Sequence, residues 1–365
     1  MNQSRWPQWL PLREDLQELV PYGAPQLPSL AQLNTNENPY PPSRELVQAI
    51  AKRVEEVAGS LNRYPDREAI DLRSALANFL NELSGLHLSA KQIWAANGSN
   101  EVIQSLFLAF GGRGALGFTP SYSMHPLIAR VTGTSWINGE RREDFTIDAI
   151  AASAQILSTR ASLIFVTTPN NPTGTAISLT DLEIMAKAAG SVGGLLVVDE
   201  AYAEFSQEHS ALDLLEKYPH LVVIRTMSKA FAFAGARVGY LAGDEEVVNA
   251  MQIVRLPYHL SALTQAVALV ALEHRKELLS AVETLIASRQ WVSRQLESLG
   301  VKVVPSSANF LLFTVPSSQE IWQSLLDQGV LVRDVGLSGY LRVTIGNEAE
   351  NERFISALRN SLGGK

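Results

Sequence analysis

Four short runs of β-branched and other apolar residues recur along the chain, and their spacing most restricts the fold. The runs lie at 162–166, 194–198, 221–224 and 238–241. Each is apolar almost throughout, so both faces of the corresponding strand need a cover. Strands of this kind that alternate with helices predict an α/β fold with a mainly parallel sheet between helices.

The rest of the chain divides into three parts. Residues 1–43 are rich in proline and asparagine, which predicts an extended N-terminal arm. We assign 44–270 to a large domain and 271–365 to a smaller α+β domain. After the long amphipathic helix expected at 275–298, the pattern of alternating helices and apolar strands changes to four short strands with two helices. The expected helices are 44–58, 68–83, 99–110, 123–132, 275–298, 318–328 and 348–361, and the further strands are 92–96, 115–118, 301–304, 310–313, 330–333 and 341–345.

Charge and composition exclude several classes of protein. A formal charge of -7 and a pI near 5.5 argue against a nucleic-acid partner, which requires a basic surface. The lack of cysteine excludes thiolate chemistry and disulfides, and the six histidines lack the spacing of metal ligands. No signal peptide or bilayer-spanning apolar stretch is expected, so we expect a soluble cytoplasmic protein without a membrane partner.

Polar residues follow several expected strands, where ligands gather in open α/β sheets. Gly98, Ser99 and Asn100 follow strand 92–96, and Ser99 is expected to cap the next helix, whose N-terminus can bind a phosphate. An ordinary helix cap is the alternative. After strand 162–166 the loop 167–174 contains two prolines and two asparagines that can reach a ligand. An Asn-Pro turn without a ligand is the alternative there.

Asp199 and Lys229 are the residues that point to a reaction. Asp199 ends a buried strand, where a carboxylate needs a cationic partner. A lysine can form a Schiff base with an aldehyde cofactor, and a carboxylate can keep the cofactor's pyridine nitrogen protonated. Thr226, Ser228 and Arg237 add hydroxyls and a guanidinium that suit a phosphate. Without these neighbours Lys229 is better explained as a solvated surface lysine.

Together these segments resemble a known family. Asn170–Gly174, Val198–Tyr202 and Ser228–Lys229 with Arg237 resemble the fold-type-I aminotransferases. The segments 21–25, 33–39, 62–66 and 228–231 look like those of the histidinol-phosphate aminotransferases, and the similarity runs from about residue 13 to 362. The resemblance implies pyridoxal 5'-phosphate (PLP) as cofactor, a seven-stranded type of sheet in the large domain, and a homodimer.

The resemblance also implies roles for residues of the cofactor site. Lys229 is expected to form the Schiff base and to move the proton, with Asp199 at the pyridine nitrogen. Tyr202, the third expected catalytic residue, and Asn171 are expected to contact the phenolic oxygen O3', and Tyr122 to stack on the ring. The cofactor phosphate is expected to meet Gly98, Ser99, Asn100, Thr226, Ser228 and Arg237, together with Tyr64 of the partner subunit.

The substrate side is implied in the same way. One arginine must accept both the carboxylate of glutamate and the phosphate of histidinol phosphate, and Arg342 resembles the family's carboxylate-binding arginine. Arg333 is expected as a second phosphate contact, with a salt bridge to Asp334 or a surface charge as the alternative. Tyr22 of the arm, Asn36 and Asn171 complete the expected substrate contacts.

The activity implied is transamination of L-histidinol phosphate with 2-oxoglutarate, by a ping-pong mechanism in histidine biosynthesis. The products are 3-(imidazol-4-yl)-2-oxopropyl phosphate and L-glutamate. An aromatic amino acid aminotransferase is the alternative, because Phe231 and Phe233 near Lys229 suit aromatic substrates. A phosphothreonine decarboxylase, a relative that the sequence resembles to a similar degree, is a further alternative. A PLP-binding regulator would need an attached helix-turn-helix, and a nucleotide-binding module would need a Walker or dinucleotide motif on a strand-to-helix turn; neither pattern is present.

Overall fold

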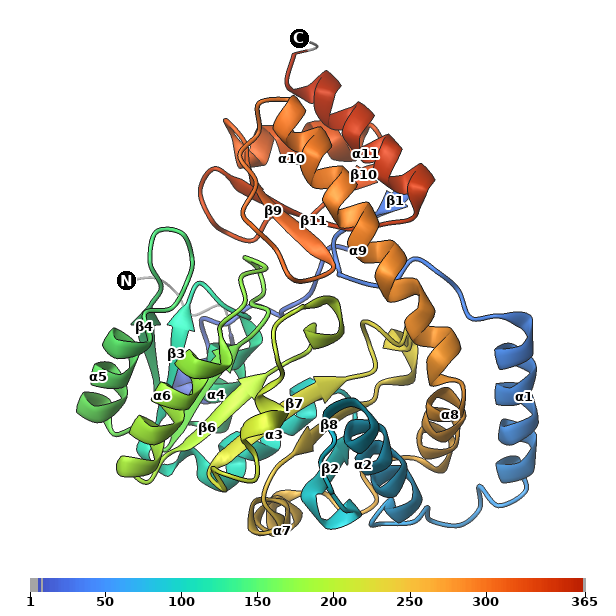
Figure 1. Cartoon of the computed structure of the whole chain (residues 1–365), viewed down its shortest axis with the longest axis vertical. Coiled ribbons are helices and arrows are strands. Elements are labelled where there is room, and N and C mark those ends of the chain that lie inside the picture. The colour runs from blue at the N-terminus through green and yellow to red at the C-terminus, as the bar shows by residue number, and fades with distance from the viewer. Residues whose placement is uncertain (1–5, 8, 364–365) are drawn as a thin grey trace.

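A seven-stranded sheet lies at the centre of the computed structural model, which describes residues 6–7 and 9–363 (Figure 1). The strand order is β2-β8-β7-β6-β5-β3-β4. β8 runs antiparallel to β2 and β7, whereas the other neighbouring pairs are parallel. The predicted mainly parallel α/β sheet is therefore confirmed. The strands are β2 (Ile93–Ala96), β3 (Ala115–Thr119), β4 (Trp136–Glu140), β5 (Leu163–Thr167), β6 (Leu195–Asp199), β7 (Leu221–Thr226) and β8 (Gly239–Ala242).

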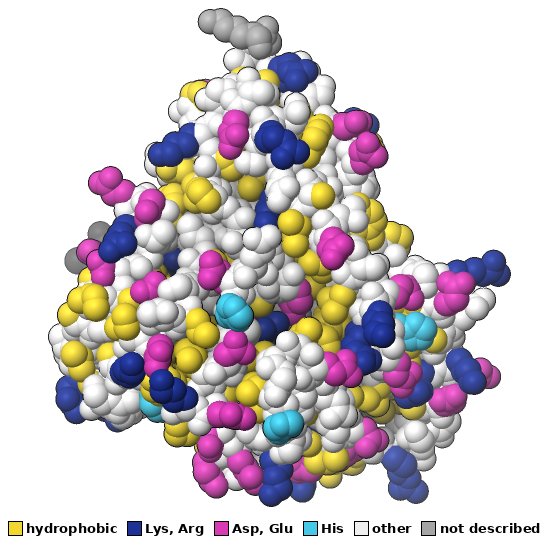
Figure 2. Space-filling view, in the orientation of Figure 1, with side chains coloured by type: hydrophobic (Ala, Val, Ile, Leu, Met, Phe, Trp, Pro, Cys, Tyr) yellow, Lys and Arg dark blue, Asp and Glu magenta, His cyan; other side chains and the backbone are white. Residues whose placement is uncertain are grey.

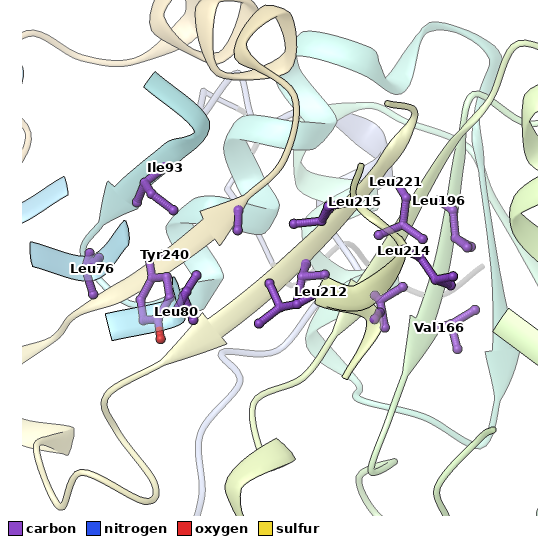
Figure 3. Close-up of a cluster of buried hydrophobic side chains, with 14 of the residues drawn as sticks. Leu76, Leu80, Ile93, Val166, Leu196, Leu212, Leu214, Leu215, Leu221 and Tyr240 are labelled. Atoms are coloured by element: carbon purple, nitrogen blue, oxygen red, sulfur yellow. The ribbon is translucent and has the colours of Figure 1, made fainter. Parts of the chain in front are cut away.

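Alternate side chains of the central strands enter two separate cores. On β6, Leu196 and Val198 pack in the core that includes α2, α5, α6 and α8, whereas Leu195 and Val197 pack with α3, α4 and α7. Figure 3 shows Leu196 in the first core, next to side chains from neighbouring strands. Successive strand residues point to opposite faces, so two covered faces explain the nearly continuous apolar runs. The helices are α1 (Arg44–Ala58), α2 (Ile70–Ser84), α3 (Ser99–Phe110), α4 (Met124–Thr132), α5 (Ala149–Thr159), α6 (Leu179–Ser191), α7 (Glu245–Val254) and α8 (Ala262–Glu273).

A third core lies in the C-terminal part of the chain, beyond the sheet in Figure 1. Two strand pairs form it together with three helices. Ala31 and Leu33, from the N-terminal segment, are fully buried in this core, so part of the predicted arm packs as an integral strand. The antiparallel pair is β9 (Phe310–Thr314) with β11 (Tyr340–Thr344), the parallel pair is β1 (Ala31–Gln32) with β10 (Val330–Leu331), and the helices are α9 (Arg275–Ser298), α10 (Ser318–Asp327) and α11 (Glu348–Ser361).

Three details of the strands differ from the sequence predictions. Residues 301–304 are not a strand, since Val303 forms only an isolated bridge with Phe313 and the following Pro305 lacks an N–H to extend the pairing. The predicted strand 330–333 is shortened to β10, with Arg333 in an isolated bridge to Arg342. β4 was not predicted, because this edge strand is largely exposed and has no continuous apolar run.

The predicted boundaries of the N-terminal arm (1–43), the large domain (44–270) and the small domain (271–365) stay predictions. Residues 1–5, 8, 364 and 365, at the ends of the predicted arm and small domain, lie outside the described residues. In the part of the chain that is described, no helix has the length and apolarity needed to cross a membrane. Figure 2 shows acidic and basic side chains interspersed over one face of the molecule. The cytoplasmic location and the lack of a nucleic-acid partner stay predictions.

Candidate active site

A cavity of about 630 Å³ opens where β5, β6 and β7 end. Thr167, Asp199 and Thr226, the last residues of these strands, line it together with the N-terminal segment and two arginines of the C-terminal part. This position at the carboxyl ends of parallel strands is the one expected for ligands of open α/β sheets. The predicted residues that line the cavity are Tyr22, Asn36, Ser99, Asn100, Tyr122, Asn171, Asp199, Tyr202, Thr226, Ser228, Lys229, Arg237, Arg333 and Arg342.

Lys229 lies in the loop after β7 and reaches the opposite wall of the cavity. Its Nζ donates a hydrogen bond to the backbone oxygen of Thr35 at 2.8 Å. Burial, followed by the positive charge of Arg342, lowers the pKa of Lys229 to about 8. About a tenth of the side chain is therefore a neutral amine at pH 7, the form that attacks a carbonyl or takes up a proton. Lys229 is not a solvated surface lysine.

Asp199 has a partner that the sequence required but did not identify. Its Oδ2 lies 3.1 Å from Nε2 of His125, and its Oδ1 accepts a hydrogen bond from the N–H of Ala201 at 3.2 Å. His125 stands in the first turn of α4 and is almost fully buried. The ring of Tyr122 meets the His125 ring edge to face, with centroids 5.4 Å apart. The spacing of three residues between Tyr122 and His125 is the one signal that could have connected them.

A second buried ion cluster supports the turn after β6. Arg225 forms an ion pair with Glu200 at 2.7 Å and donates to Glu204 at 2.9 Å, with all three side chains less than 10% exposed. Burial raises the pKa of Glu204, and Arg225 opposes this shift. Because Glu200 and Glu204 flank Tyr202, the guanidinium ties the turn that carries Tyr202 to β7. Sequence reasoning did not single out Arg225.

An anion cradle forms where β2 leads into α3. Gly98, with φ of +83°, is the N-cap of α3, and Ser99 is its first residue, so the predicted capping role of Ser99 is wrong. A glycine cap offers no side chain to occupy the first N–H groups of the helix. Arg237 lies so close that a Cβ on Gly98 would be 2.5 Å from its Nη2. Its Nη1 donates to the hydroxyl of Ser228 at 3.4 Å, and the Thr226 hydroxyl donates to the same oxygen at 3.0 Å.

The two asparagines of the loop after β5 act differently. Asn170 is fully buried and holds the loop, since it accepts from the Ser121 hydroxyl at 2.9 Å and donates to the Pro120 carbonyl at 3.0 Å. Asn171 faces the cavity, where its Oδ1 accepts a hydrogen bond from Arg342 Nη1 at 2.5 Å.

Two arginines face the cavity from adjacent positions of the C-terminal part. The backbones of Arg333 and Arg342 exchange hydrogen bonds of 2.9 Å. Burial, with a smaller contribution from Arg333, lowers the pKa of Arg342 to about 10. Within the described residues, Arg342 Nε has no hydrogen-bond partner and Arg333 forms no ion pair with Asp334. Two cations side by side favour an anionic ligand.

The hydroxyl of Tyr202 meets the amide of Asn36. Asn36 Nδ2 donates to Tyr202 Oη at 2.9 Å, and the Thr344 hydroxyl donates to Asn36 Oδ1 at 3.1 Å. Both Asn36 and Tyr202 are buried to more than 95%. Tyr122 and Asn100 also line the cavity, and the Tyr122 hydroxyl donates to Asn100 Oδ1 at 3.2 Å.

Tyr64 lies away from the cavity of its own subunit. It is 78% exposed, and its ring stacks on Tyr258 with centroids 4.3 Å apart. Exposed apolar side chains with short sequence separations from these tyrosines include Leu61, Ile253 and Leu256.

Comparison with known proteins places this site in a family. A model of the family "Aminotransferase class I and II" matches residues 28–358. The chain belongs to this aminotransferase family. The aminotransferase is 53% identical over 353 residues to the histidinol-phosphate aminotransferase of Mycolicibacterium vanbaalenii, with 95% of each chain covered. It is 55% identical over 359 residues to the histidinol-phosphate aminotransferase of Thermobifida fusca, with 97% of this chain and 96% of the relative covered.

Solved structures share the fold of this aminotransferase. The histidinol-phosphate aminotransferase of Sinorhizobium meliloti in complex with PLP has a TM-score of 0.85 at 24% identity, covering 96% of this chain and 97% of the other. The enzyme of the same name from Clostridium acetobutylicum has a TM-score of 0.82 at 23% identity, covering 92% of this chain and 100% of the other. The predicted fold-type-I architecture is confirmed.

The cavity of the aminotransferase fits PLP, the cofactor of this family. A lysine with a lowered pKa suits the aldehyde, and a buried carboxylate suits a protonated ring nitrogen. The glycine-capped helix end beside Arg237 suits the phosphate, because a Cβ on Gly98 would fill the space that Arg237 needs. The predictions of a PLP-dependent aminotransferase and of its cofactor are confirmed.

Proposed function

We propose that this aminotransferase transfers the amino group of L-histidinol phosphate to 2-oxoglutarate, giving 3-(imidazol-4-yl)-2-oxopropyl phosphate and L-glutamate. Relatives that are 53% and 55% identical over nearly the whole chain carry the name histidinol-phosphate aminotransferase. The observation that carries the proposal is the pair of arginines, Arg333 and Arg342, facing the same cavity as Lys229. Both substrates bring an anionic group to that end of the site.

Lys229 is the proposed proton carrier. When bound, PLP supplies an aldehyde that condenses with amines and a pyridine ring that withdraws electrons from the carbon that loses a proton. The amine of Lys229, neutral in part because its pKa is lowered to about 8, would take the proton from the α-carbon of the substrate, hold it on Nζ and deliver it to the carbon that comes from the PLP aldehyde. The carbonyl of Thr35, which now accepts from Nζ, holds the amine within the cavity.

Asp199 and His125 act together at the ring nitrogen. Asp199 would supply the negative charge that keeps this nitrogen protonated, and His125 lies 3.1 Å from the carboxylate and orients it. Tyr202 and Asn171 are placed to contact the phenolic oxygen, and Tyr122 to cover one face of the ring.

The cofactor phosphate would lie at the start of α3. Ser99 and Asn100 supply backbone N–H groups, Thr226 and Ser228 supply hydroxyls, and Arg237 supplies charge. We further propose a homodimer in which Tyr64 of the partner subunit completes this phosphate site. The exposure of Tyr64 and of the apolar side chains near it supports a contact with a second copy.

Arg342 and Arg333 would each bind a different anionic group of the two substrates. Arg342 is fixed by Asn171 and by the carbonyl of Asn34, so its free Nε and its charge suit a carboxylate in a set position. Arg333, less buried, lies with its Cζ 5.9 Å from the ring centroid of Tyr22 and suits the larger phosphate.

A half-reaction titration tests the proposal. The purified enzyme with PLP is mixed with histidinol phosphate, glutamate, phenylalanine or tyrosine in turn, without the second substrate, and the visible absorbance of the lysine-bound cofactor is followed. We expect histidinol phosphate and glutamate to remove the band at the lowest concentrations. An unchanged band with histidinol phosphate would show that the proposed substrate is wrong, whereas conversion by phenylalanine alone would favour the aromatic aminotransferase.

A further inference from the structure

A chain of hydrogen bonds begins at Thr344 of β11 and leads into the cavity. The Thr344 hydroxyl accepts the backbone N–H of Asn36 at 2.9 Å and donates to Asn36 Oδ1 at 3.1 Å. A hydroxyl has one proton, and since the backbone N–H must be the donor in the first bond, that proton is free for the second. The amide of Asn36 is thereby oriented, with its oxygen toward Thr344 and its NH₂ group away from it.

The backbone of Asn36 is held as firmly as its side chain. Its φ is +56°, in the left-handed region that asparagine tolerates better than most residues. Asn309 Nδ2 donates to its carbonyl at 3.1 Å. With 1% of Asn36 exposed, its amide has little room for another partner. These contacts explain why an asparagine is needed here, at a position that also lines the cavity.

The orientation of Asn36 determines the direction of the Tyr202 proton. Asn36 Nδ2 donates to Tyr202 Oη at 2.9 Å, so the phenol oxygen is the acceptor in this bond. Its own proton must then go to another acceptor. Burial raises the pKa of the Tyr202 phenol, so the proton is retained at neutral pH. Tyr202 lines the cavity, and the charged groups around it there are Asp199, Lys229 and Arg342.

We propose that Thr344 and Asn36 are positioning residues that turn the Tyr202 hydroxyl so that it donates its proton into the cavity, to the phenolic oxygen of PLP. If the amide were reversed, its oxygen would face Tyr202 and would take this proton instead. The reversal would place the amide NH₂ at Thr344 and leave the hydroxyl proton without this acceptor, so the hydroxyl of Thr344 disfavours it. The N-terminal segment and β11, 308 positions apart, thus set a proton donor in the turn after β6.

The proposal is tested by the pH titration of the visible absorbance of the PLP-loaded enzyme. A donor to the phenolic oxygen stabilises its anionic form, so weakening the donor raises the apparent pKa of the chromophore. We expect Tyr202→Phe to raise it by about one pH unit and Thr344→Val by a smaller but resolvable part of that shift. Thr344→Ser keeps the hydroxyl and is expected to match the wild type.

A second variant and a double variant keep the test decisive. Asn36→Gly removes the amide, tolerates the positive φ and is expected to shift the pKa as Thr344→Val does, so it replaces that variant if the latter does not fold. In the Tyr202→Phe background, Thr344→Val is expected to add no further shift. Thr314→Val on β9 removes a hydroxyl that donates to the Lys302 carbonyl at 3.4 Å and is expected to change nothing.

Three results would overturn the proposal. The first is an unchanged chromophore pKa in Tyr202→Phe. The second is a wild-type chromophore pKa in both Thr344→Val and Asn36→Gly. The third is an equal pKa shift from Thr344→Val with and without the Tyr202 hydroxyl. The inference rests on PLP at this site and not on the substrate. A wild-type protein without a visible band would contradict the cofactor, and a different amino donor would leave the titration unchanged.

Discussion

His125 Nε2 and Asp199 Oδ2 lie 3.1 Å apart, with 1% of the histidine and 2% of the aspartate exposed. A carboxylate so far from water is unfavourable unless its oxygens are hydrogen-bonded. Here one oxygen meets the imidazole and the other meets a backbone N–H. The pair holds a negative charge at the end of β6, where the cavity receives the ring of the cofactor.

Removal of the imidazole is expected to weaken PLP binding. In His125→Ala the carboxylate loses its orientation and a hydrogen bond worth about 1.5 kcal/mol, so the dissociation constant should rise roughly tenfold. Titration of the apoenzyme with PLP measures it. His220→Ala is the matched control, because His220 contacts the Ala186 carbonyl at 2.8 Å outside the cavity. Equal losses in both variants would contradict the role of His125.

Lys229 is expected to react as an amine of low pKa. Its neutral fraction in the apoenzyme follows a pKa of about 8, below the 10.5 of an ordinary lysine. Labelling by an amine reagent should therefore rise about tenfold from pH 7 to 9 and then level off. Mass spectrometry of the labelled peptide gives the profile, with the exposed Lys52 as the reference. A rate that continues to climb beyond pH 10 would refute the lowered pKa.

The same shift makes a prediction for stability. The folded apoenzyme binds the Lys229 proton less tightly than the unfolded chain does, so the free energy of unfolding rises with pH between about 8 and 10.5 on account of this group. Lys229→Met should stabilise the apoenzyme at pH 7 and lose this advantage near pH 10. Denaturant unfolding at both pH values measures the difference, and a constant difference would speak against the linkage.

Gly239 is expected to be essential for the anion cradle at the start of α3. A Cβ at this position would lie 2.2 Å from the backbone nitrogen of Ser99, so the start of α3 would have to move. Gly239→Ala should weaken PLP binding by tenfold or more, on the order of the loss of a charge-assisted hydrogen bond. Gly59→Ala is the control, since a Cβ there meets nothing within 4 Å. Unchanged PLP binding in Gly239→Ala would show that the cradle adapts.

Arg225 is expected to matter for stability more than an exposed arginine. Arg225→Met leaves Glu200 and Glu204 buried without a cation, which should lower the free energy of unfolding by about 3–5 kcal/mol. Arg275→Met breaks a 2.7 Å pair with Glu82 that is partly exposed, and should cost less than about 1 kcal/mol. Urea denaturation of both variants makes the comparison, and similar losses would contradict it.

Arg333 is expected to distinguish a phosphorylated substrate from a plain aromatic one. Arg333→Ala should raise the KM for histidinol phosphate roughly tenfold or more, through loss of a charge-assisted contact, and leave that for phenylalanine nearly unchanged. Steady-state kinetics with both amino donors tests this. If the two KM values rise equally, Arg333 does not read the phosphate.

Much of the fold could be read from local patterns. The ends of α1, α3, α9 and α11 agree with the predicted 44–58, 99–110, 275–298 and 348–361, because their apolar periodicity lies within each segment; α1 and α11 also begin at side-chain caps, Ser43 and Asn347. The strands of the sheet interior were found for a similar reason, since both of their faces are buried. β4 was missed because an exposed edge strand leaves no such pattern.

The sequence by itself determined the order of the strands along the chain, the residues at their carboxyl ends and the lysine among them. Only the tertiary structure decided the partners: His125 for Asp199, Arg225 for Glu200, and the link from Thr344 through Asn36 to Tyr202. Periodicity reports whether a residue is buried, which is a local property. Which side chains meet depends on how distant segments pack, and here residues 308 positions apart share a hydrogen bond.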